Sequence, residues 1–140
     1  MTTPIRRAHR SRALDMPLYL IVADESSLTE LEVGLATLPL CSRGRVFVEV
    51  QHSSQIEFLA APPRMTITWF VRESARQTTP PGITVGRAVA AWASEMLCGD
   101  DSRAQPWLLG ADSTVAPVRE LLSRPEVPSA PIMTAAAFRL

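Results

Sequence analysis

Two carboxylates and two hydroxyls follow one another directly after an apolar stretch near the start of the chain. Residues 17–23 read Pro-Leu-Tyr-Leu-Ile-Val-Ala, and Asp24, Glu25, Ser26 and Ser27 come next. Adjacent carboxylates can serve as a general acid and base, but at the start of a helix they more often stabilise its N-terminus. We therefore expect this turn to cap a helix first, with ligand contact as the alternative.

A single arginine holds a comparable position further along the chain. Arg72 directly follows the strand-like stretch 65–71, Met-Thr-Ile-Thr-Trp-Phe-Val. Open α/β sheets place their ligands outside the carboxyl ends of their strands. This position makes Arg72 a candidate for binding a charged ligand.

The sequence lacks the residue patterns of several common active sites. The turn at 24–27 has no Gly-x-Gly or lysine-bearing phosphate loop, and no serine nucleophile elbow is present. His9 and His52 have no second histidine or cysteine at metal-ligand spacing, so we expect no metal site. Cys41 and Cys98 are far apart in sequence and are interpreted as free thiols.

Length and charge describe one small domain. The chain has 140 residues, and its 14 basic residues, all arginine, balance 14 acidic ones. Because the chain has no net positive charge, we expect no nucleic-acid partner. No apolar run approaches the roughly 18 residues of a membrane-spanning helix, so we expect no membrane partner and a cytoplasmic location. Residues 1–16 are arginine-rich and predict a basic, disordered tail, which leaves one domain over residues 17–140.

Hydrophobic patterning predicts alternating strands and helices. Unbroken apolar runs indicate buried strands, and leucines or valines three to four residues apart indicate amphipathic helices. We place the Trp69, Trp92 and Trp107 side chains in the core. Such alternation favours an α/β, Rossmann-like three-layer domain with a roughly five-stranded, mostly parallel sheet. The expected strands cover 17–23, 45–50, 65–71, 107–110 and 131–140, and the expected helices carry Leu28, Leu31, Leu35 and Leu38, then Val85, Ala88, Val89, Trp92 and Met96 before an end at 99–101, then Val115, Val118, Leu121 and Leu122.

Four stretches in this order resemble a known family. They are Tyr-Leu-Ile-Val-Ala-Asp-Glu-Ser-Ser-Leu at 19–28, Leu-Pro at 38–39 followed by Val-Phe-Val-Glu-Val at 46–50, Thr-Trp-Phe-Val-Arg at 68–72, and Trp-Leu-Leu-Gly at 107–110 with Val-Arg-Glu-Leu-Leu at 118–122 and a closing Ala-Phe-Arg at 137–139. This pattern is similar to the C-terminal half of the siderophore-interacting proteins, which are flavin-dependent ferric-siderophore reductases. The resemblance spans nearly all of residues 17–140.

The resemblance implies a division of labour between two domains. In the family, this half is the nicotinamide-nucleotide side, and a separate N-terminal barrel holds FAD. By the resemblance, NAD(P)H is the expected cofactor, this chain alone is not expected to hold FAD, and a partner flavoprotein or a ferric-siderophore complex completes any redox activity. The implied cofactor-binding residues are Asp24, Glu25, Ser26, Ser27, Arg72 and Gly110.

The sequence also departs from the family pattern. Ala111 stands where the family carries a glutamate after the glycine, and Ala137 and Phe138 replace a closing Tyr-Trp pair. We interpret Arg119 and Arg139 as surface arginines in preference to ligand-binding ones. The alternative function is a non-catalytic protein-interaction or dimerisation module on the same scaffold. Independently of this choice, we expect self-association through the surface that a flavin domain would cover. No catalytic residue is assigned, and enzymatic activity is left open.

Overall fold

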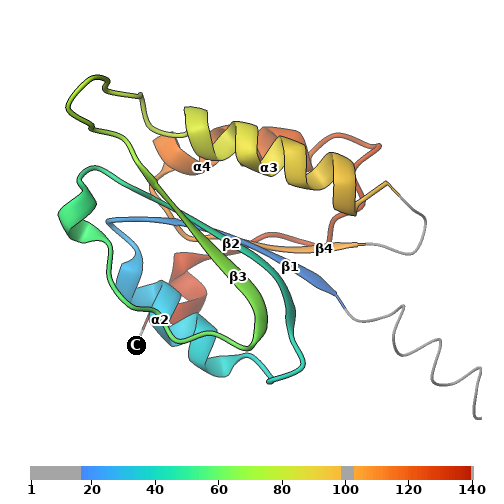
Figure 1. Cartoon of the computed structure of the whole chain (residues 1–140). Coiled ribbons are helices and arrows are strands. Elements are labelled where there is room, and N and C mark those ends of the chain that lie inside the picture. The colour runs from blue at the N-terminus through green and yellow to red at the C-terminus, as the bar shows by residue number, and fades with distance from the viewer. Residues whose placement is uncertain (1–16, 99–102, 140) are drawn as a thin grey trace, which may run out of the picture.

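One parallel sheet forms the middle of the molecule (Figure 1). The computed structural model describes residues 17–98 and 103–139. The strands are β1 (Leu18–Asp24), β2 (Arg43–Val50), β3 (Arg64–Val71), β4 (Ala104–Leu108) and β5 (Met133–Thr134). Their order is β3-β2-β1-β4-β5 and every pair is parallel, which confirms the predicted α/β class. The chain moves outward from β1 first to one side and then to the other, so the topological switch point lies between β1 and β4.

Helices cover both faces of this sheet. They are α2 (Leu28–Thr37), α3 (Ile83–Met96) and α4 (Asp112–Leu122), with short 3-10 turns η1 (Ser53–Gln55) and η2 (Ala135–Phe138). α3 and α4 lie together on one face, and α2 lies with η2 on the other (Figure 1). The result is the three-layer arrangement expected from the sequence.

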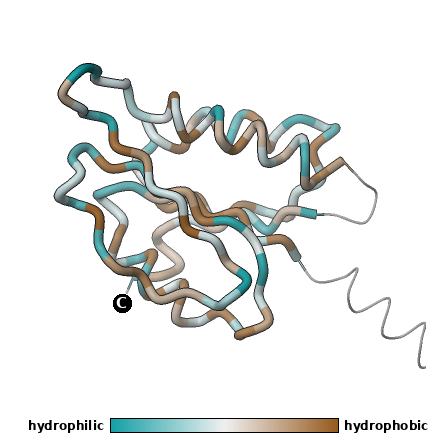
Figure 2. Tube along the Cα trace, in the orientation of Figure 1, coloured by the Kyte–Doolittle hydropathy of each residue, from teal (hydrophilic) through white to brown (hydrophobic). Residues whose placement is uncertain are grey.

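The central strand β1 shows why the expected apolar runs become strands. Leu20 and Val22 belong to the core under α3 and α4, whereas Ile21 and Ala23 belong to the core under α2. Successive side chains point to opposite faces, so a strand covered on both sides must be apolar at every position. Figure 2 shows the hydrophobic colour concentrated along this middle layer.

The last strand is much shorter than predicted. The expected strand over 131–140 was wrong in its extent, because β5 has two residues and the chain then turns through η2. The turn brings the Phe138 ring to 4.6 Å from the Trp107 ring, measured between centroids. A Cβ on Gly34 of α2 would lie 2.8 Å from Trp107, so the absence of a side chain there allows this close packing. Burial of Phe138 thus overrides an extended conformation.

Two boundaries also differ from the prediction. β4 begins at Ala104 and includes Pro106, because β5 pairs only with Trp107 and Leu108 and no β5 ladder bond is needed at the proline. Met96, expected to point inward from α3, is 40% exposed. The helix end expected at 99–101 and the tail at 1–16 lie outside the described residues.

Other sequence predictions hold. Trp92 and Trp107 are buried, Trp69 packs at the margin of the core, and Cys41 and Cys98 are free and exposed.

Candidate functional site

The turn after β1 is organised by one buried carboxylate. Asp24 Oδ1 accepts hydrogen bonds from the Ser26 N–H (2.9 Å) and hydroxyl, and the Asp24 N–H donates to Ser27 Oγ (3.1 Å). Ser27 is the N-cap of α2, but its hydroxyl makes no capping bond to the helix. The expectation that these side chains cap α2 was therefore wrong, because they bond to one another within the turn.

The same carboxylate crosses the switch point. Asp24 Oδ2 accepts the N–H of Ala111, the residue that precedes α4, at 2.8 Å. A Cβ on Gly110 would lie 2.8 Å from this oxygen, closer than ordinary packing allows. The structure therefore explains Gly110 by close approach of its backbone to Asp24, and its contact with a cofactor stays a prediction.

Arg72 lies in a second group, the arginine cluster, formed by Glu25, Glu49, Gln51 and Arg72. The guanidinium donates from Nη1 to Glu49 Oε2 (3.0 Å), from Nε to Gln51 Oε1 (3.0 Å), and from Nη2 to Glu25 Oε1. Arg72 is only 5% exposed. Its nitrogens are thus committed to three protein side chains, one on β2 and one in each of the turns that follow β1 and β2.

Glu49 connects this cluster to a helix. The side chain is fully buried on β2, and its Oε2 also accepts the N–H of Gly82, the N-cap of α3, at 3.0 Å. Glu49 pairs in register with Asp24, so two neighbouring strands each carry, at or one residue before their end, a carboxylate that accepts the N-cap N–H of a helix on the same face. Each carboxylate also lies at the positive end of that helix dipole.

The arginine cluster carries more negative than positive charge. Glu25 and Glu49 face one arginine, and Glu25 Oε2 and Glu49 Oε1 are buried with no hydrogen-bond donor. A phosphate at Arg72 would have to replace Glu25, the one partly exposed carboxylate of the pair. Contact between Arg72 and a phosphate stays a prediction that requires this exchange.

A pocket of about 240 Å³ opens beside the switch point. We call it the edge pocket; Gly110, the start of α4 at Asp112, and two arginines, Arg119 and Arg139, line it together with η2. Arg119 lies 3.6 Å from Asp112, and Arg139 lies 3.5 Å from Glu30. Both arginines are about half exposed or more, so these ion pairs are weak and exchangeable.

A second pocket of about 480 Å³ lies toward the other end of α4. It shares Arg119 with the edge pocket, and its lining includes Leu122 and Ser123 at the end of α4 and Arg103 and Ser129 beside the start of β4. The start of a helix and exposed arginines are groups that bind anions. The edge pocket, which lies at the start of α4, can therefore hold a phosphate-bearing ligand, in contrast to the arginine cluster.

The structure thus divides the predicted residues into two groups. It joins Glu25 to Arg72, and it joins Asp24, Ser26 and Ser27 to Gly110, which also reaches the edge pocket with Arg119 and Arg139. Sequence reasoning missed Glu49. The available signal was a glutamate between two valines in an otherwise apolar strand, where a charge needs a partner.

Among residues 17–98 and 103–139, no group of three or more metal-binding side chains comes together. In the same ranges, no helix is long and apolar enough to cross a membrane.

Comparisons with known proteins point to one family. The family model described as siderophore-interacting protein matches residues 16–137. The crystal structure of the siderophore-interacting protein SipS from Aeromonas hydrophila is 22% identical with a TM-score of 0.62, covering 86% of this chain and 50% of that one. That of a siderophore utilization protein from T. fusca is 25% identical with a TM-score of 0.57, covering 83% and 42%. No curated protein matches. The chain spans about half the length of these solved structures or less.

Proposed function

Because the chain belongs to the siderophore-interacting protein family, we propose that it binds NAD(P)H at its carboxyl edge and supplies electrons toward ferric-siderophore reduction. The flavin that accepts the hydride would come from a partner flavoprotein or another domain. Bound NAD(P)H supplies the hydride, and the residues of this chain bind and orient it.

The edge pocket is the observation that supports this proposal. It lies at the carboxyl ends of β4 and β5, next to the switch point between β1 and β4, and it combines Gly110 with the start of α4. Arg119 and Arg139 add positive charge, and their weak ion pairs leave both available to a phosphate.

The arginine cluster would contribute differently. Two carboxylates face its one arginine, so it is poorly suited to phosphate, whereas the partly exposed Glu25 side chain is suited to accept a hydrogen bond from a hydroxyl or amide group. We therefore assign phosphate binding to Arg119 and Arg139, and we assign Glu25, the partly exposed carboxylate of the cluster, to a donor group of the nucleotide.

A nucleotide titration tests the proposal. Thermal unfolding of the full chain is followed with NADH, NADPH and FAD added separately. Ligand present at 100 times its dissociation constant should add roughly 2.7 kcal/mol to the free energy of unfolding, so a nicotinamide nucleotide should raise the melting temperature by several degrees. Stabilisation by FAD alone, or by none of the three, would contradict nucleotide binding.

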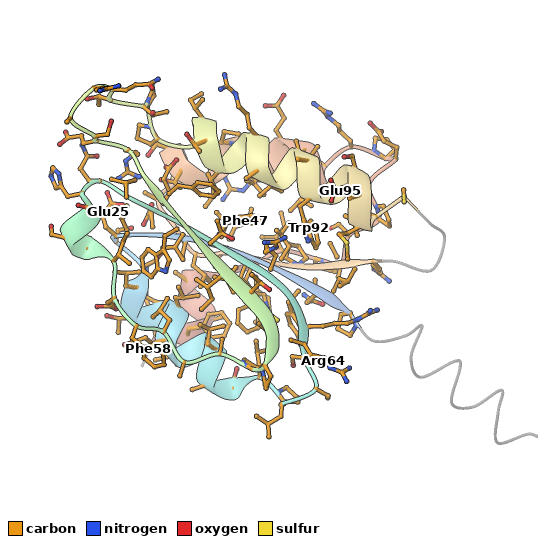
Figure 3. All side chains as sticks on the ribbon, viewed as in Figure 1. Glu25, Phe47, Phe58, Arg64, Trp92 and Glu95 are labelled. Carbon is orange, nitrogen blue, oxygen red and sulfur yellow. The ribbon has the colours of Figure 1, made fainter. Side chains whose placement is uncertain are left out.

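A non-catalytic interaction module is the second candidate. Phe58, which Figure 3 shows beside α2, is 88% exposed, and Leu40 is 80% exposed. If these two side chains belong to one apolar patch, they favour a partner surface. This candidate would gain if a folded sample responded to no nucleotide.

A further inference from the structure

The two edges of the sheet end in different ways. At one edge, β5 has only two residues and is followed at once by η2. At the other edge, β3 has eight residues, pairs with β2 along its whole length, and has no further strand beside it in the described residues (Figure 1). A short edge strand prevents pairing with other chains, whereas a long regular one invites it.

The outer backbone groups of β3 can be identified. The N–H of Arg72 donates to the Val50 carbonyl of β2 at 2.8 Å, and N–H groups alternate in direction along a strand. The groups that face away from β2 therefore belong to residues an odd number of positions before Arg72: Ile67, Trp69 and Val71. They form a row of donors and acceptors without a partner strand.

The usual protections of an edge strand are missing from this row. Residues 65–71 contain no proline, no charged side chain and no residue with positive φ, and their register with β2 has no bulge. Trp69 and Phe70, on opposite faces, are each only partly buried although they pack against the two cores. A strand added beside β3 would cover both aromatic rings at once.

We propose that β3 pairs antiparallel with the β3 of a second copy of this chain, so that two sheets become one. A two-fold axis at Trp69 places Trp69 opposite its own copy and Ile67 opposite Val71, so outward donors meet outward acceptors. Arg64 and Arg72 then face uncharged residues of the second copy. The chain has a formal net charge of zero, so overall repulsion does not oppose the pairing.

Hydrogen exchange at several concentrations tests this surface directly. In the full chain, amide exchange at Ile67, Trp69 and Val71 should slow by about tenfold or more as concentration rises, while Thr68 and Phe70, bonded to β2, stay protected throughout. Light scattering on the same samples should show a dimer. Fast exchange of the three amides at all concentrations would overturn the proposal, as would protection that does not depend on concentration, since another segment of the chain would then cover the edge.

A matched pair of variants gives a second readout. Ile67→Pro removes an outward N–H without removing a bond to β2, and Ile67→Thr keeps that N–H while changing the side chain. The proline variant should be monomeric at concentrations where the threonine variant and the parent dimerise. Equal dimerisation of a folded Ile67→Pro protein would contradict pairing through β3. If this variant does not fold, the amide hydrogen exchange of the parent chain still decides whether β3 pairs with a second copy.

Discussion

Arginines at the carboxyl edge occur in two contrasting settings. Arg72 is buried and bonded to Glu25, Glu49 and Gln51, whereas Arg119 and Arg139 are exposed and each pairs loosely with one carboxylate. Position at the end of a strand is therefore not enough to identify a ligand-binding arginine. What matters is whether the guanidinium still has exchangeable partners, since a buried charge already paired is costly to re-pair.

The largest expected effect is a loss of stability when the buried ion pair of Arg72 is broken. Glu49→Ala removes an acceptor from Arg72 and from the Gly82 N–H, and should lower the free energy of unfolding by about 3–5 kcal/mol. Urea denaturation followed by circular dichroism measures it. Glu57→Ala, at an exposed glutamate, is the control and should change stability little. A loss at position 49 no larger than that of the control would show that Glu49 does not hold Arg72 and α3 together.

A smaller effect on stability is expected at the contact between Gly110 and Asp24, which lies between the arginine cluster and the edge pocket. Gly110→Ala places a Cβ against Asp24 Oδ2 and should cost about 1–3 kcal/mol, because the turn or α4 must shift. In an Asp24→Ala background the same substitution should cost clearly less, which a double-mutant cycle measures. Equal costs in both backgrounds would mean that Asp24 is not what Gly110 accommodates.

Much of the fold follows from the sequence, and the reasons are local. β1 and α2 were predicted within a residue or two because an apolar run and leucines at helical spacing leave few alternatives. The fifth strand was overestimated because the contact between Phe138 and Trp107 joins residues distant in sequence. Local patterns do not report such a contact.

The candidate site was predicted less completely than the fold. The sequence placed Asp24, Glu25 and Arg72 at the same edge, because parallel strands end together. It did not show that Glu25 and Glu49 would both form ion pairs with Arg72, because the partners of a charged side chain depend on the register of three neighbouring strands. Arg119 and Arg139 were interpreted as surface arginines, and the structure adds that both line the edge pocket.

The central claim is that the exposed arginines, and not Arg72, bind the phosphates of a nicotinamide nucleotide. The most direct test compares the dissociation constants of NADH and NADPH for the parent chain, Arg119→Gln and the control Arg87→Gln, measured by titration calorimetry. Arg87 is exposed on α3, away from the edge pocket. Loss of a charge-assisted hydrogen bond should weaken binding roughly tenfold or more in Arg119→Gln and leave Arg87→Gln unchanged. Nucleotide binding that is equally tight in both variants would contradict the account.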